Sequence, residues 1–260
     1  MATLASTASG PLRPSASNAP LLTRARRPTE EELAGVPWLP ALDAEERAAA
    51  IDDLRVVRVD TGELLCRVGR PVTYWFGVID GFLKMSNDSG TGRGLSGAET
   101  DAESMPITFT GLPPGGWFGE GTVIKREVYR YNIKAVRKSV VAGLSVSTFH
   151  WLLDRSIPFN RFIIQQLNER LGQFIGARET DRMINVDARV ARSLGALFHP
   201  VLYPGVAGLL RITQQELGYL IGLSRQRVNE ALNVLQDRGL IRIEYGGVRV
   251  LDLEGLRRVG

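Results

Sequence analysis

The spacing of apolar residues divides the chain into a strand-rich part and a helix-rich part. From Val56 to Val146, short runs that partly alternate between apolar and polar residues are separated by glycines such as Gly62, Gly69 and Gly81. Short alternating runs with glycine turns are typical of antiparallel sheets. We therefore expect an antiparallel sandwich or barrel here, followed by helices.

Two polar stretches lack any apolar period. Residues 1–28 are rich in Ala, Ser, Pro and Arg, and residues 87–104 are rich in Gly, Ser and acidic residues. Such composition is typical of chain without a packed core. We expect a disordered tail at 1–28 and a long, mobile hairpin loop at 87–104.

Capping residues mark the predicted helices. Asp43 with Glu46 three residues later predicts a capping box, Ser156 followed by Pro158 predicts the start of a long helix, and Asp187 predicts the start of the next. The apolar residues of the long helix follow steps of mostly three and four, which indicates one stripe. This stripe either packs on the chain's own β-domain or pairs with a second copy; it contains Phe159, Phe162, Ile163, Leu167, Leu171, Phe174 and Ile175.

Residues 214–233 fit the helix-turn-helix pattern. Gly218 lies where the two helices would meet, and Gly222 lies where the turn needs a left-handed backbone. Apolar residues fill the inward positions, and Ser224 can cap the second helix. The outward face of that helix carries polar groups suited to base edges in the major groove, namely Arg225, Gln226, Arg227, Asn229 and Glu230. An ordinary amphipathic hairpin with a solvated face is the alternative.

Two alternating segments around Gly246 and Gly247 predict a hairpin after the second helix. A helix-turn-helix followed by a β-hairpin is a winged helix. Arg242 and Arg249 on this hairpin either touch backbone phosphates or are solvated strand residues.

Composition excludes several classes of site. A net charge of +4 and a pI of about 9.4 permit a polyanionic partner but do not require one. One cysteine, Cys66, cannot hold an iron–sulfur cluster, and two histidines far apart do not suggest a metal enzyme. No run of eighteen apolar residues predicts a membrane span.

The order of a glycine-punctuated β-domain, a long striped helix and a winged helix resembles the Crp/Fnr family of bacterial transcription regulators. The most specific motifs are GGWFGEG at 115–121 and ITQQELGYLIGLSRQRVNEAL at 212–232, and the resemblance covers about residues 40–256. It implies an α+β fold with an antiparallel, cyclic-nucleotide-binding-like β-roll at 29–155, a dimerisation helix at 156–186 and a winged helix-turn-helix at 187–260.

The resemblance also implies partners and contacts. We expect a homodimer that binds a palindromic site on double-stranded promoter DNA, with RNA polymerase as a further partner and no membrane. Thr213, Gln215 and Ser224 match positions that contact phosphate, with Arg227 beside them. Arg225, Gln226 and Glu230 match positions that contact bases. Gln226 and Glu230 depart from the cyclic-AMP receptor pattern, which has Glu and Arg there.

A cyclic nucleotide remains open as the effector. The cradle needs backbone amides at a helix start, an acid for the ribose and an arginine for the phosphate. Gly119, Glu120, Gly121 and Thr122 match the first two requirements, and Arg130 is the nearest candidate for the third, although Tyr131 replaces the expected Ser. Glu120 is either a ribose acceptor or part of a structural turn.

We therefore predict a cytoplasmic, sequence-specific DNA-binding regulator. The alternative is a ligand-sensing module of the cyclic-nucleotide-binding type that acts through protein contacts. We do not expect an enzyme, because residues 56–146 contain no histidine for a cupin-like metal centre and no nucleophile–base pair is evident.

Overall fold

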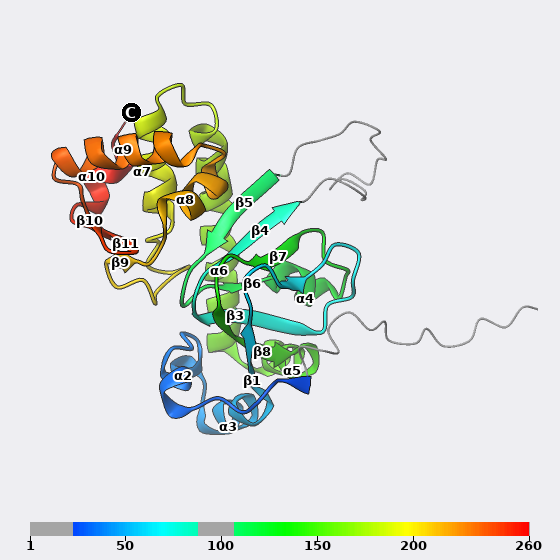
Figure 1. The fold of residues 1–260 in the computed structure, drawn as a ribbon. Coiled ribbons are helices and arrows are strands. Elements are labelled where there is room, and N and C mark those ends of the chain that lie inside the picture. The colour runs from blue at the N-terminus through cyan, green and yellow to red at the C-terminus, as the bar shows by residue number, and fades with distance from the viewer. Residues whose placement is uncertain (1–22, 88–106, 260) are drawn as a thin grey trace, which may run out of the picture.

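The computed structural model describes residues 23–87 and 107–259 (Figure 1). Most of the predicted tail at 1–28 and nearly all of the predicted loop at 87–104 lie outside these residues. Arg26 forms an isolated antiparallel bridge with Val56. The domain boundaries given above remain predictions.

Within the described residues, the strand-rich part folds as two antiparallel four-stranded sheets, which confirms the predicted sheet class. The sheets have the orders β1-β8-β3-β6 and β2-β7-β4-β5. Apolar side chains from both sheets form a shared core. The strands are β1 (Arg55–Val59), β2 (Leu64–Cys66), β3 (Tyr74–Asp80), β4 (Leu83–Asn87), β5 (Ile107–Leu112), β6 (Trp117–Phe118), β7 (Asn132–Ala135) and β8 (Ser139–Ser145).

Short helices close the end of the roll near the start of the long helix. Asp43 and Glu46 form the predicted capping box at the start of α3 (Ala44–Asp53). Trp38, Trp75 and Trp117 are buried together, with Trp75 and Trp117 ring centroids 4.4 Å apart. This aromatic cluster joins the N-terminal helices to the sheet. The other helices in this part are α2 (Glu30–Ala34), the 3-10 helix η1 (Leu39–Ala41), α4 (Glu120–Lys125) and α5 (Val146–Arg155).

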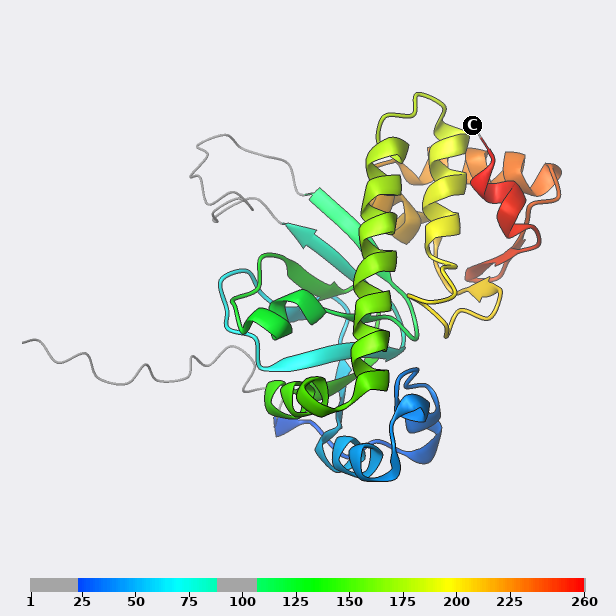
Figure 2. The ribbon, with the colours of Figure 1, turned by 180° about the vertical axis from the view of Figure 1, so that it is seen from behind.

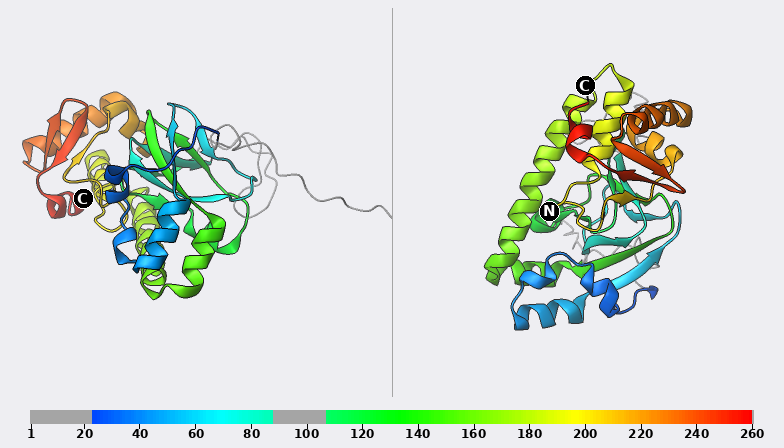
Figure 3. Two further views of the ribbon diagram at one scale, coloured as in Figure 1. Left: turned by 90° about the horizontal axis from the view of Figure 1, so that it is seen from below. Right: turned by 90° about the vertical axis from the view of Figure 1, so that its left-hand side faces the viewer.

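The long helix α6 (Ile157–Thr180) begins at Ser156, whose hydroxyl accepts from the Phe159 amide as predicted. It runs along most of the length of the molecule (Figure 2) and forms one of its edges in the right-hand view of Figure 3. One face packs against the β-roll, and it carries the buried residues Phe159, Ile163, Gln166 and Arg170.

The predicted single stripe on α6 separates into two faces. Phe159 and Ile163 are buried, whereas Leu167, Leu171 and Ile175 are exposed. Each step of four residues advances about 40° around a helix axis, so Ile175 lies about 120° from Ile163. One face therefore packs on the chain itself, and the other carries exposed apolar residues.

The C-terminal part is a winged helix, as predicted. Its elements are α7 (Val186–Ala196), β9 (Leu209–Leu210), α8 (Gln214–Ile221), α9 (Arg225–Asp237), β10 (Ile241–Glu244), β11 (Gly247–Val250) and α10 (Leu253–Arg257). The predicted N-cap of α7 was wrong. Asn185 caps this helix by accepting from the amides of Asp187 and Ala188, because an Asn side chain two residues earlier reaches both amides.

The winged helix packs closely against the β-roll. Phe82, just before β4, belongs to the buried core that α7, α8 and α9 form. A Cβ on Gly111 of β5 would lie 2.5 Å from the Phe82 ring and 3.1 Å from Leu220 of α8. Only glycine therefore fits at this point of contact.

Candidate nucleic-acid interface and effector cradle

Two glycines shape the turn between α8 and α9. Gly222 has φ 66° and ends α8, donating its amide to the carbonyl of Gly218. A Cβ on Gly218 would lie 2.6 Å from the carbonyl oxygen of Leu223. The positive φ and the close approach explain why the sequence has glycine at both positions.

Side-chain caps fix the starts of both helices. Thr213 and Glu216 form a reciprocal capping box at the start of α8. Ser224 caps α9 by accepting from the amide of Arg227 at 3.3 Å. Thr213 and Ser224, both predicted phosphate contacts, are therefore also the residues that begin the two helices.

The outward face of α9 carries most of the predicted base-contacting residues. Arg225, Gln226, Arg227 and Glu230 are exposed together. Glu230 accepts from Gln226 at 3.1 Å and from Arg227 at 3.0 Å. Asn229 differs, because its side-chain oxygen accepts from Gln214 of α8 at 2.7 Å and ties the two helices together.

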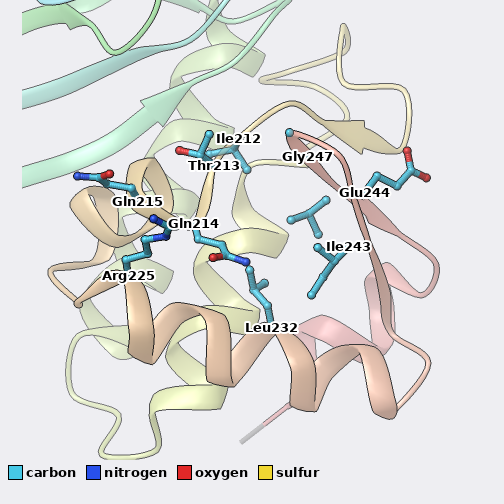
Figure 4. A pocket seen from close by; sticks show the side chains of 11 residues that line it. Ile212, Thr213, Gln214, Gln215, Arg225, Leu232, Ile243, Glu244 and Gly247 are labelled. Carbon is cyan, nitrogen blue, oxygen red and sulfur yellow. The ribbon is translucent and has the colours of Figure 1, made fainter.

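A groove of about 360 Å³ lies between α8, α9 and the wing strands β10 and β11. Gln215 and Arg225 lie at one end of it and Glu244 lies at the other (Figure 4). Arg249 forms an ion pair with Glu244 within the wing. The sequence left open whether Arg242 and Arg249 contact phosphate. Arg249 is already paired, whereas Arg242 is exposed.

The predicted cradle lies at the start of α4. Gly119 has φ 87° and is the N-cap, and Glu120 is the first helical residue and is buried. Gly121 and Thr122 follow in the first turn. The amide of Thr122 already donates to the carbonyl of Gly119 at 3.0 Å, so it is not free for a phosphate.

The sequence did not reveal which residue forms an ion pair with Glu120. Arg170 of α6 donates from Nε to Oε1 of Glu120 at 3.0 Å and from Nη2 to the Trp117 carbonyl at 2.7 Å. Burial alone would lower the pKa of Arg170, but the Glu120 carboxylate beside it raises it above its ordinary value. The sequence does carry a signal for this partner. Gln166 and Arg170 continue the steps of three and four residues that begin with Phe159 and Ile163 on the buried face of α6.

The predicted phosphate partner has a different partner in this structure. Arg130 is exposed and pairs with Glu127 at 3.2 Å. The next residue, Tyr131, points inward instead, and its hydroxyl lies 3.4 Å from where a Cβ on Gly119 would stand. Burial raises the pKa of Tyr131, so this hydroxyl stays neutral.

Some of the groups that a cyclic nucleotide would contact already have partners within the chain. Oε1 of Glu120 accepts from Arg170, and Oε2 is buried without a hydrogen-bond partner among the described residues. The Arg130 guanidinium is also occupied by Glu127.

Within the described ranges 23–87 and 107–259, no group of three His, Cys, Asp or Glu side chains is arranged to hold a metal ion. In the same ranges, no helix has the length and apolar character needed to cross a membrane.

Comparisons with known proteins give two family models. A Crp-like helix-turn-helix domain matches residues 188–259, and a cyclic nucleotide-binding domain matches residues 56–156. The chain is 25% identical over 188 residues to the cAMP-activated global transcriptional regulator CRP of Haemophilus influenzae, covering 68% of this chain and 75% of that protein. It is 28% identical over 157 residues to the cAMP-activated regulator Vfr of Pseudomonas aeruginosa, covering 56% and 70%.

Solved structures share the fold. FixK2 from Bradyrhizobium japonicum has a TM-score of 0.57 at 16% identity, covering 77% of this chain and 94% of that one. The c-di-GMP responsive regulator CLP of Xanthomonas campestris has a TM-score of 0.51 at 23% identity, covering 80% and 99%.

Proposed function

The chain belongs to the Crp/Fnr family of transcription regulators, and on this premise we propose that it binds a two-fold symmetric promoter site as a homodimer. The observation that carries this proposal is the exposed polar face of α9, with Arg225, Gln226, Arg227 and Glu230 on one side of a capped helix. A helix with such a face fits the major groove, where base edges offer matching donors and acceptors.

The exposed apolar face of α6 supports the homodimer. Ile164, Leu167, Leu171 and Ile175 are 38–66% exposed on one side of this helix. A second copy would cover these residues in a short coiled coil. Two α9 helices related by such an axis would need a spacing of about 34 Å to meet successive major grooves.

The predicted phosphate contacts extend this interface. Thr213, Gln215 and Ser224 lie at or near the starts of α8 and α9, where amides and the helix dipole favour an anion. Asn229 is held by Gln214, so its role is to join the two helices rather than to read a base. We further propose a cytoplasmic location, RNA polymerase as a partner and the absence of catalysis, all of which the family supports.

The β-roll is proposed to act without a cyclic nucleotide. Matched relatives are described as cAMP-activated. Here Glu120 is paired with Arg170, the Thr122 amide is bonded, and Arg130 faces solvent. We infer that Gly119, Glu120 and Gly121 serve as a turn that receives α6.

Selection of binding sites from random double-stranded DNA tests the main proposal. We expect the full-length chain to enrich a palindromic sequence, with an affinity that falls steeply as salt rises. A chain that enriches no sequence and binds DNA no better than a basic control would favour the alternative, a module that acts through protein contacts.

A further inference from the structure

A β-roll arginine reaches the first helix of the helix-turn-helix. Arg137 lies in the turn between β7 and β8 and donates from Nη2 to Oε2 of Glu216 in α8 at 2.7 Å. Both side chains are largely buried, with 26% and 14% exposed. The Arg137 guanidinium also lies 5.7 Å from the centre of the Phe82 ring. The pair is therefore held at the packed junction between the two domains.

The same Oε2 atom of Glu216 also accepts a second hydrogen bond. Its Oε2 accepts from the Thr213 amide at 2.6 Å, while the Glu216 amide donates to the Thr213 hydroxyl at 3.2 Å. This is the capping box that begins α8. Arg137 therefore adds a donor from the β-roll to a cap that lies entirely within the DNA-binding domain.

Glu216 carries its negative charge in the first turn of α8. The start of α8 carries Thr213 and Gln215, which the proposed function assigns to backbone phosphate. A carboxylate close to a bound phosphate is repulsive unless a cation offsets it, and screening is weak for buried groups. Arg137 supplies that cation and fixes the carboxylate in its capping position.

We propose that Arg137 is a positioning residue of the DNA-binding surface, which holds α8 through Glu216 and offsets its charge beside the DNA backbone. The proposal rests on the proposed DNA-binding function. Under this proposal the β-roll helps to position the DNA-binding surface. Phe82 and Arg137 both come from β-roll turns, and both contact the winged helix.

A double-mutant cycle tests the proposal. Full-length Arg137→Met, Glu216→Gln and the double variant are titrated with the selected promoter site at several salt concentrations. Met keeps an apolar stem over Phe82, and Gln can still close a capping box. We expect Arg137→Met to weaken binding about tenfold, and Glu216→Gln in that background to restore most of the loss, because directly paired residues are energetically coupled.

Controls separate the outcomes. Arg130→Met removes a β-roll arginine that pairs with Glu127 instead, and it should leave DNA affinity unchanged. Arg137→Lys keeps the charge and should stay within about threefold of wild type. Affinity of Arg137→Met equal to wild type, an equal loss in Arg130→Met or Arg137→Lys, or no recovery in the double variant would overturn the proposal. Failure of the wild type to select any site would instead remove the proposed function.

Discussion

Arg170 and Glu120 form a buried ion pair that joins α6 to the start of α4 across the cradle. The Nε–Oε1 distance is 3.0 Å, and both side chains are less than 10% exposed. Arg170 also holds the Trp117 carbonyl. The helix with the exposed apolar face is thus tied to the β-roll by a contact within the chain itself.

Loss of Arg170 should destabilise the β-roll. Arg170→Met leaves the Glu120 carboxylate buried without its cation, and breaking such a pair costs about 3–5 kcal/mol. Glu120→Gln in the same background should recover much of this, because it removes the unpaired charge. Denaturant unfolding of the three proteins measures the effect.

Arg178 offers the matched control for this experiment. It lies on the same helix but is exposed, so Arg178→Met should change the unfolding free energy by less than about 0.5 kcal/mol. Equal stability of Arg170→Met and Arg178→Met would contradict a structural role for the ion pair.

Cyclic AMP and cyclic GMP should give neither heat nor a thermal shift with the wild-type chain. A ligand at a hundredfold excess over its dissociation constant stabilises a protein by about 2.7 kcal/mol, so binding would be easy to detect. Arg130→Ala should behave like wild type. Saturable binding that this substitution abolishes would restore Arg130 as the phosphate partner.

The sequence predicted the helix-turn-helix better than the cradle. Gly218 and Gly222 are close together in sequence, and their backbone requirements fix the turn locally. Arg170 lies fifty residues from Glu120, so only the packing of α6 on the β-roll brings them together. Periodicity showed an apolar helix but did not separate its two faces.

The sequence around the predicted cradle arginine does not fix which side chains point inward. Residues 129–131 lie in irregular backbone just before β7, where the alternation of strand side chains does not apply. The expected position for a phosphate-binding arginine holds a solvent-facing Arg130, while the neighbouring Tyr129 and Tyr131 point inward. Only the folded backbone shows that Arg130 faces solvent while its two neighbours point inward.

The exposed face of α6 allows a test of the proposed dimer. Leu171 is 60% exposed near the middle of this face, and Leu171→Glu should place repelling carboxylates along the proposed dimer axis. We expect sedimentation to show a shift from dimer to monomer and DNA affinity to fall. Ile184→Glu is the control, because Ile184 is 98% exposed but lies beyond the end of α6. Dimers that survive Leu171→Glu would argue against this interface.

Substitutions on the outward face of α9 should change the DNA sequence that the protein prefers. Arg225→Ala should cost about 1–3 kcal/mol of promoter binding and relax the preference at one base pair. Gln226→Glu should change the preferred neighbouring base, because Gln pairs with adenine whereas Glu accepts from cytosine. Site selection with each variant measures this. Identical selected sequences for wild type and Gln226→Glu would rule out base reading by Gln226.

A histidine at the junction of α6 and the winged helix should make stability depend on pH. His199 Nδ1 lies 3.3 Å from the amides of Val201 and Leu202, and Nε2 lies 3.2 Å from Glu169. In this arrangement Nδ1 accepts and carries no proton. Burial lowers the pKa of His199, Glu169 opposes this, and Arg257 adds to it.

Because the folded pKa lies below the ordinary value of about 6.5, the unfolded chain takes up the proton first as pH falls. The stability that His199 contributes is therefore present above about pH 6.5 and is lost as pH falls through the lower folded pKa. His199→Gln should flatten the dependence of the unfolding midpoint on pH across this window. His150→Gln is the matched control, since it removes the other histidine and leaves His199 in place. An equal flattening in both variants, or none in His199→Gln, would show that protonation of His199 does not weaken this junction.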